Sequence, residues 1–485
     1  MNEKSPPRRR AEDTETAAEL SLEWHRPLSP SRRTNTLAPG IGVPAIIMIG
    51  LGGVIGSGIF VASGIPVHAA GPGVILSFLI GAAVVMPVAL YLAEMEAAHP
   101  SAGAFSYYAY RYLHPLMGFV TGWMYWSKGV LAMATEVTAA ALLMRWWLPA
   151  WPLWVFSLFF SLLITGINFL DIRGFSRIEG WFASIKILAL FLFILLGLSI
   201  LAGLWPGIPS PGTTNFFAHG GLLPHGLKGI YASLLLVVFA YSGNSVVAMT
   251  AAQAADPART IPRAVLGTIS AITILYTGAI FVLVGLLPWV DVPTSSSPFV
   301  AVLEKVHITF AGNILNAVIL TAVLSSMNTS MFGVSNMLRS LAERNEAPRF
   351  LLKTGRSGVP VYALAVSSLF LGLAVLLAYL LPRKVFLYVA SASGFISIFN
   401  WTITTLTFIS YRRKTRPAGR LFTVPGYPLL PALSLLLLLA AAASVPLTAG
   451  QLPGMISGLA LATFFTVLFL LLSRRGAAGK NSGAD

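Results

Sequence analysis

Two glycine-containing stretches interrupt apolar segments and hold the groups that could bind a small charged solute. The first reads GLGGVIGSGIF over residues 50–60, with five glycines in nine residues, and the second reads FAYSGNS over 239–245. Each glycine costs about 1 kcal/mol in a helix interior, so both stretches predict a break in a helix. The alternatives are close packing of helices through small residues and hydrogen bonds between helices.

A break in a membrane-spanning helix has a definite chemistry. Unpaired backbone groups survive at membrane depth only where they line a cavity. One half-helix then presents N–H groups and a positive dipole end, and the other presents C=O groups and a negative end. The first end attracts a carboxylate and the second an ammonium, so the pair predicts a site for an α-amino acid.

Three charged residues lie well inside apolar segments, away from the segment ends: Lys128, Glu136 and Lys186. A charge at this depth costs several kcal/mol and marks a functional candidate. We expect Lys186 to be a titratable group, the alternative being a lysine that reaches the membrane surface. Glu136 is either functional or a partner for another buried group. Lys128 precedes Glu136 by about 12 Å of helix rise, which is too far for a direct pair, so its role stays open.

The elements that must position these residues are membrane-spanning helices. Of the 485 residues 56% are hydrophobic and 10% charged, against about 25% charged in a soluble protein, which excludes a soluble enzyme and a disordered chain. A spanning helix needs about 20 apolar residues. Twelve such segments are predicted, at about 43–65, 73–97, 118–147, 153–170, 181–204, 229–252, 263–287, 312–338, 359–381, 385–410, 428–446 and 452–473.

The positive residues behind the net charge of +15 lie mainly in the predicted loops and tails. With the N-terminus inside, 25 of the 32 Lys and Arg residues fall in cytoplasmic segments and five in outer loops. This asymmetry fits the positive-inside rule, predicts cytoplasmic termini and removes nucleic acid as a partner. Residues 1–40 are expected to be a disordered tail, 41–475 the transmembrane domain and 476–485 a second tail. With no cysteine and seven scattered histidines, no disulfide or metal site is expected.

The first break lies in the first of segments 1–5, and the second break lies in the first of segments 6–10. The two breaks therefore occupy corresponding positions in two sets of five helices. Interrupted helices at corresponding positions of two halves point to a transporter binding site. We therefore expect one repeat at about 43–204, a second at about 229–410, and two further helices at about 428–473.

The sequence also resembles a known family. GGVIGSGIF at 52–60 and AGPG at 70–73 resemble the opening of the amino acid–polyamine–organocation superfamily. AEM at 93–95, PSAGAF at 100–105 and ADPARTIPRA at 255–264 are similar to its bacterial amino acid transporter branch. The resemblance implies an all-α, LeuT-like fold of twelve transmembrane helices, with two inverted five-helix repeats plus two helices, in the bacterial cytoplasmic membrane.

The resemblance also implies roles for individual residues. The stretch at 55–58 would hold the substrate carboxylate and the carbonyls at 239–241 its ammonium, with the Tyr241 ring shaping the side-chain pocket. Lys186 matches a lysine that replaces sodium in proton-coupled relatives, and Glu136 matches an acid of the third span. The substrate-binding set is Ile55, Gly56, Ser57, Gly58, Phe239, Ala240, Tyr241 and Gly243. The expected side-chain pocket is Met133, Ser245, Ser325, Asn328 and Ser393.

Two departures narrow the expected function. Relatives commonly have glutamate where this chain has Ser245 and, eight residues later, Gln253, which disfavours a carboxylate relay and a basic cargo. We expect a permease that takes up an α-amino acid with protons by alternating access, or else an exchanger of the same fold. A channel, a nutrient sensor and an enzyme fit less well. The expected partners are the amino acid and membrane lipid, with a proton as coupling ion and no cofactor; the sequence does not predict which amino acid or which oligomeric state.

Overall fold

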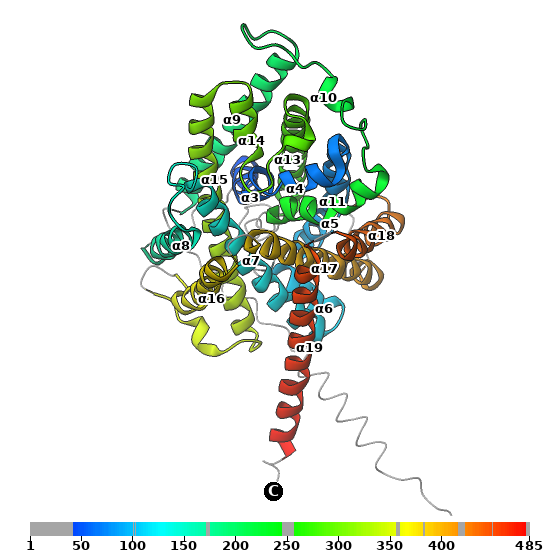
Figure 1. The fold of residues 1–485 in the computed structure, drawn as a ribbon. Coiled ribbons are helices and arrows are strands. Elements are labelled where there is room, and N and C mark those ends of the chain that lie inside the picture. Colours follow the sequence, from blue (N-terminus) through cyan, green and yellow to red (C-terminus); the bar gives the residue numbers. More distant parts are fainter. Residues whose placement is uncertain are drawn as a thin grey trace, which may run out of the picture. The chain divides into compact units, whose positions relative to one another are not determined.

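The computed structural model describes residues 42–99, 101, 103–170, 175–244, 257–355, 359–381, 384–415, 422–448 and 450–481. Within these residues the regular structure is entirely helical (Figure 1). The expected tail at 1–40 and Ser245 lie outside the described residues.

The described helices are α2 (Val43–Val54), α3 (Ser57–Phe60), α4 (Gly64–Ala70), α5 (Val74–Ala98), α6 (Ala104–Tyr112), α7 (Pro115–Met144), α8 (Leu153–Leu170), α9 (Phe175–Leu201), α10 (Thr214–Phe217), α11 (Gly226–Tyr241), α13 (Pro257–Leu286), α14 (Pro298–Lys305), α15 (Thr309–Glu343), α16 (Val361–Leu380), α17 (Val385–Lys414), α18 (Leu429–Ser444) and α19 (Leu452–Asn481). Short 3₁₀ turns are η1 (Gly71–Gly73), η2 (Ser242–Asn244), η3 (Trp289–Asp291), η4 (Arg349–Leu352) and η5 (Val445–Leu447). Eight helical stretches of the described chain are long and apolar enough to cross a membrane, and four shorter apolar helices accompany them.

The first predicted segment, 43–65, is divided. α2 ends at Val54, α3 begins at Ser57, and Ile55 and Gly56 between them have non-helical backbone. The sixth segment changes character at the predicted place, because α11 ends at Tyr241 and the 3₁₀ turn η2 follows it. Both breaks therefore fall within the stretches that the glycines mark.

α7 and α15 form the most extensive helix pair and provide one wall of the site. They approach closely at Gly129, where an added Cβ would lie 2.1 Å from a methyl group of Val334. At one end of the pair, the Asn313 amide oxygen accepts hydrogen bonds from the indole N–H groups of Trp146 and Trp147, at 3.0 and 3.1 Å. α17 also packs on α7, while α2 packs on α9, α13 and α15.

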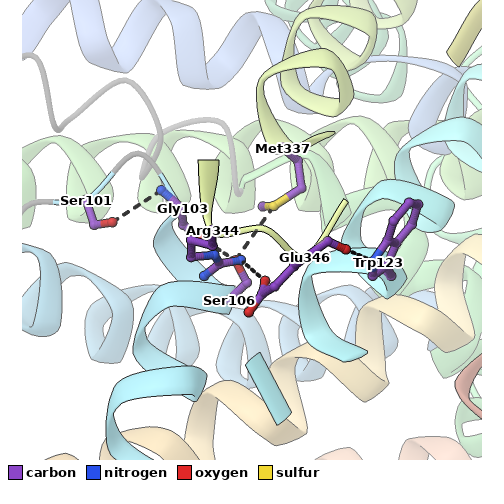
Figure 2. Close-up of polar contacts among 7 residues, drawn as sticks. All are labelled: Ser101, Gly103, Ser106, Trp123, Met337, Arg344 and Glu346. Carbon is purple, nitrogen blue, oxygen red and sulfur yellow. Dashed lines mark hydrogen bonds and ion pairs between the residues drawn. The ribbon is translucent and has the colours of Figure 1, made fainter. Parts of the chain in front are cut away.

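The other end of the α7–α15 pair is held by a buried polar cluster (Figure 2). The Trp123 indole N–H donates to the carbonyl oxygen of Glu346 at 3.2 Å. Arg344, which directly follows α15, forms an ion pair with the Glu346 carboxylate at 2.8 Å and donates to the Ser106 hydroxyl of α6 at 2.9 Å. The cluster thus joins α6, α7 and the end of α15.

Removing one member of this buried ion pair should destabilise the protein in a pH-dependent way. Burial raises the pKa of the Glu346 carboxyl and Arg344 lowers it in part, so Arg344→Met should raise that pKa further. A carboxyl with a raised pKa in the folded protein contributes stability below its ordinary value of 4.5, and this contribution is lost as pH rises through the folded-state pKa. We expect Arg344→Met to cost about 3 kcal/mol at neutral pH, and less at about pH 5, in thermal unfolding of the purified protein.

The double variant Arg344→Met/Glu346→Gln is the control, because it leaves no unpaired buried charge. It should unfold at a temperature closer to the wild type at neutral pH. Equal destabilisation of the single variant at both pH values would contradict this account.

Candidate functional site

The four last carbonyl groups of α2 all find hydrogen-bond donors, although the helix stops there. The Leu51 oxygen accepts the Ile55 N–H at 3.0 Å, as in a continuing helix. The other three donors come from three other helices. Lys186 Nζ of α9 donates to the Gly52 oxygen at 2.6 Å, Ser326 Oγ of α15 to the Gly53 oxygen at 3.4 Å, and the Tyr276 hydroxyl of α13 to the Val54 oxygen at 3.0 Å.

The Lys186 side chain is fully buried and reaches a helix end, so it is not a lysine extending to the membrane surface. An ammonium at the C-terminus of a helix interacts favourably with the partial negative charge there. The residue predicted from its unusual depth is thus placed at the first break.

Glu136 lies on the opposite side of the same break. Its carboxylate accepts the backbone N–H of Ser57 at 3.0 Å, and it lies 3.1 Å from the Ser326 hydroxyl, whose single proton is shared between this carboxylate and the Gly53 oxygen. A carboxylate at the first residue of a helix complements the partial positive charge of that end. The N–H groups of Gly58 and Ile59, which come next, have no hydrogen-bond partner within the described part of the chain.

The end of α11 is the other interrupted element. Lys128 Nζ of α7 donates to the carbonyl oxygen of Ser242, the residue that follows α11, at 3.0 Å. The ammonium also lies 5.1 Å from the centre of the Tyr125 ring, within the range of a cation–π interaction. Lys128 and Glu136 therefore each contact one of the two breaks.

A cavity of about 40 Å³ lies between the two breaks, enough for a few water molecules. α7 contributes Lys128 and Glu136 to its lining, α15 contributes Ser326, and the two breaks contribute Gly58 and Ala240. Its lining combines one cationic and one acidic side chain with backbone and hydroxyl groups.

Three glycines let the interrupted helices and their neighbours approach one another. A Cβ on Gly58 would lie 2.6 Å from Ala240 Cα, and one on Gly243 would lie 2.2 Å from the Gly53 oxygen. A Cβ on Gly56 would lie 2.7 Å from the Glu136 carboxylate. At Gly58 and Gly243 the added atom would meet backbone, so space requires glycine there, whereas at Gly56 it would meet side-chain atoms of Glu136 and Ser326, which would have to shift.

The structure brings together most of the predicted backbone set. Gly58, Phe239, Ala240 and Gly243 line the cavity, and Ser57 contacts Glu136 at its edge. The Tyr241 ring is placed elsewhere: its hydroxyl donates to the Phe78 oxygen at 3.1 Å, and the ring packs against Tyr276. It does not line the cavity in this conformation.

The predicted side-chain pocket is not assembled around this cavity. Met133, Ser325, Asn328 and Ser393 are all absent from its lining within the described residues. Asn328 instead accepts a hydrogen bond from Asn168 of α8 at 2.6 Å, and Ser393 donates to the Lys128 carbonyl at 3.3 Å.

Sequence reasoning missed the side chains that do complete the site. Ser326, Ser330, Gly333 and Val334 of α15 line the cavity, and Tyr276 supports the first break. The signal was a spacing of four and then three residues between small or polar positions, which places them on one face of a helix.

Eight long apolar helical stretches, together with two shorter apolar helices that stop at a shared polar cavity, define this molecule as a polytopic helical membrane protein with the site architecture of a transporter. The family model described as amino acid permease matches residues 45–475. The chain belongs to the amino acid permease family, which confirms the resemblance to the amino acid–polyamine–organocation superfamily.

Individual relatives agree with this assignment. The chain is 33% identical over 439 residues to a gamma-aminobutyric acid permease of Bacillus subtilis (strain 168), covering 89% of this chain and 94% of the relative. It is 36% identical over 397 residues to the amino-acid permease RocC of the same organism, covering 80% and 84%. It is also 36% identical over 386 residues to the aromatic amino acid transport protein AroP of Escherichia coli (strain K12), covering 79% and 84%.

The close approach at Gly58 generates a prediction. Gly58→Ala places a methyl group against the backbone of α11, so α3 and α11 must separate. We expect a loss of about 1–3 kcal/mol in stability and a loss of amino acid uptake, measured by thermal unfolding and in proteoliposomes. Gly372→Ala in α16 is the matched control, because its added Cβ meets no atom of the described chain within 4 Å. Equal behaviour of the two variants would contradict the packing argument.

Proposed function

We propose that this protein is a secondary transporter that takes up an amino acid together with protons by alternating access. The observation that supports the proposal is the meeting of two interrupted helices at one cavity, with a buried lysine holding the carbonyl end of the first break. Interrupted helices that face each other in this way are typical of secondary transporters.

The proposed architecture has twelve spans, with inverted repeats at about 43–204 and 229–410 and two further helices at about 428–473. The eight long apolar stretches and the four shorter apolar helices, including α2 and α11 at the breaks, support that number. The charge asymmetry of the loops supports cytoplasmic termini. The tails at 1–40 and 476–485 would then flank one transmembrane domain in the cytoplasmic membrane.

The proposed cargo is a zwitterion bound by its two charged groups. Its carboxylate would accept the N–H groups of Gly58 and Ile59, which have no other partner in the described chain. Its ammonium would bind carbonyl groups at the end of α11, where Ala240 lines the cavity. The named substrates of the relatives, gamma-aminobutyric acid and aromatic amino acids, make both classes the first to test.

Lys186 and Glu136 are the proposed proton-coupling residues. Lys186 holds the carbonyl end of the first break, and Glu136 holds the N–H end. Each contacts a group that would have to change its surroundings when the break moves. Loss or gain of a proton at either residue would therefore alter how strongly the first break is held.

An exchanger of the same fold is the alternative function, and the coupling experiment separates the two. Purified protein in proteoliposomes should accumulate a radiolabelled amino acid when an inward proton gradient is imposed. A protonophore should abolish that accumulation if transport is coupled to protons, and should leave exchange against internal amino acid intact. Accumulation that survives the protonophore would refute proton coupling, and the absence of both activities for all twenty amino acids and gamma-aminobutyric acid would refute the proposed function.

The role of Lys186 has its own test. Lys186→Ala should remove the dependence of uptake on the imposed pH gradient while leaving some exchange, because the amine at the first break is gone. Lys353→Ala, which changes a lysine in the segment after α15, is the control and should keep the gradient dependence. Wild-type gradient dependence in folded Lys186→Ala would exclude this residue as the coupling site.

A further inference from the structure

Lys128 lines the cavity, and it has no role in the transport mechanism proposed above. It is 7% exposed and lines the cavity from α7 on the same helix face as Tyr125 and Glu136. A lysine that served only as packing would not need its charged end inside the cavity. The position therefore calls for a specific partner.

The partner is the carbonyl end of α11. Lys128 Nζ donates to the Ser242 oxygen at 3.0 Å, and the Tyr125 ring lies 5.1 Å from the same ammonium. The backbone of Lys128 is itself fixed, since its carbonyl accepts the Ser393 hydroxyl of α17 at 3.3 Å. An alkylammonium group of the protein thus occupies the helix end that would bind the ammonium of an amino acid.

Space makes the two ammonium groups alternatives. The cavity has a volume of about 40 Å³ and is bounded at this end by Phe239, Ala240 and Ser242. Two ammonium groups on adjacent carbonyls of one helix end would also repel each other in a medium of low dielectric constant. A substrate ammonium that binds here must therefore displace the Lys128 side chain from the Ser242 carbonyl.

We propose that Lys128 is a built-in substitute for the substrate's ammonium, which occupies the carbonyl end of α11 when the carrier is empty and yields it to the amino acid. This inference rests on the proposed transport function. A carrier that takes up substrate repeatedly must return without cargo, and during that return the partial negative charge of the carbonyl end would lack the substrate's ammonium. Lys128 provides the ammonium for the empty step, whereas the substrate provides it for the loaded step.

The proposal separates two activities that share one binding site. Net uptake requires the return of the empty carrier, while exchange of one amino acid for another requires only loaded steps. We expect Lys128→Met, which keeps the length of the side chain and removes the donor, to reduce net uptake about tenfold and to keep counterflow within about twofold. Because the internal competitor is gone, the KM for counterflow should be equal to or lower than that of the wild type.

Two variants control for charge and for general damage. Lys128→Arg keeps a cationic donor and should retain net uptake better than Lys128→Met. Lys305→Met removes an exposed lysine of α14 and should leave both activities unchanged. The melting temperature of each purified variant verifies that the protein is folded.

The outcomes are distinct. Net uptake and counterflow that fall together in folded Lys128→Met, or that both stay at the wild-type level, would overturn the substitute role. If Lys128→Met does not fold, Lys128→Leu, which also carries no donor, replaces it, and an unchanged ratio of net uptake to counterflow would overturn the proposal equally. A wild-type protein that transports no amino acid would refute the proposed function instead, and that result is obtained before any variant is measured.

Discussion

Backbone groups left open by a helix break inside a membrane must find partners, and this requirement organises the centre of the protein. In water a frayed helix end is solvated, whereas lipid offers neither donors nor acceptors. At the end of α2 the solution is three side chains from three helices: Lys186, Tyr276 and Ser326. A single unsatisfied group there would cost about 1–3 kcal/mol, so each contact has a measurable effect on stability.

The same contacts that complete the break also build the site. Ser326 touches both the Gly53 carbonyl and the Glu136 carboxylate, and Glu136 in turn holds the first N–H of α3. The chain of contacts runs from α2 through α15 and α7 to α3 without leaving the cavity wall. Fold stability and the shape of the cavity therefore depend on the same few hydrogen bonds.

The sequence predicts those parts of the site where a single apolar segment contains residues that are unfavourable in lipid, namely glycines, polar residues or charges. The glycines at the first break, the polar run after Tyr241 and the two buried charges Lys186 and Glu136 each stand out locally. The structure places Lys186 and Glu136 at the first break, a position that the sequence alone did not specify. Whether they bind substrate and protons stays a prediction.

The parts that could not be predicted depend on how helices are rotated against one another. Ser325 and Ser326 are neighbours in the sequence, yet one step along a helix turns a side chain by about 100°, and only Ser326 reaches the cavity. Asn328 faces α8 for the same reason. Serine, asparagine and tyrosine are frequent in spanning helices as packing and hydrogen-bonding residues, so their type alone does not identify a wall of the site.

The fastening of α7 to α15 at both ends has a mechanical consequence. The Trp123–Glu346 contact joins the pair at one end (Figure 2). Asn313 joins it at the other end, and Gly129 packs closely against Val334 between them. Because the pair is fastened at both ends, we expect it to move as one unit. Any opening of the cavity to either side should then come from movement of the short helices at the breaks.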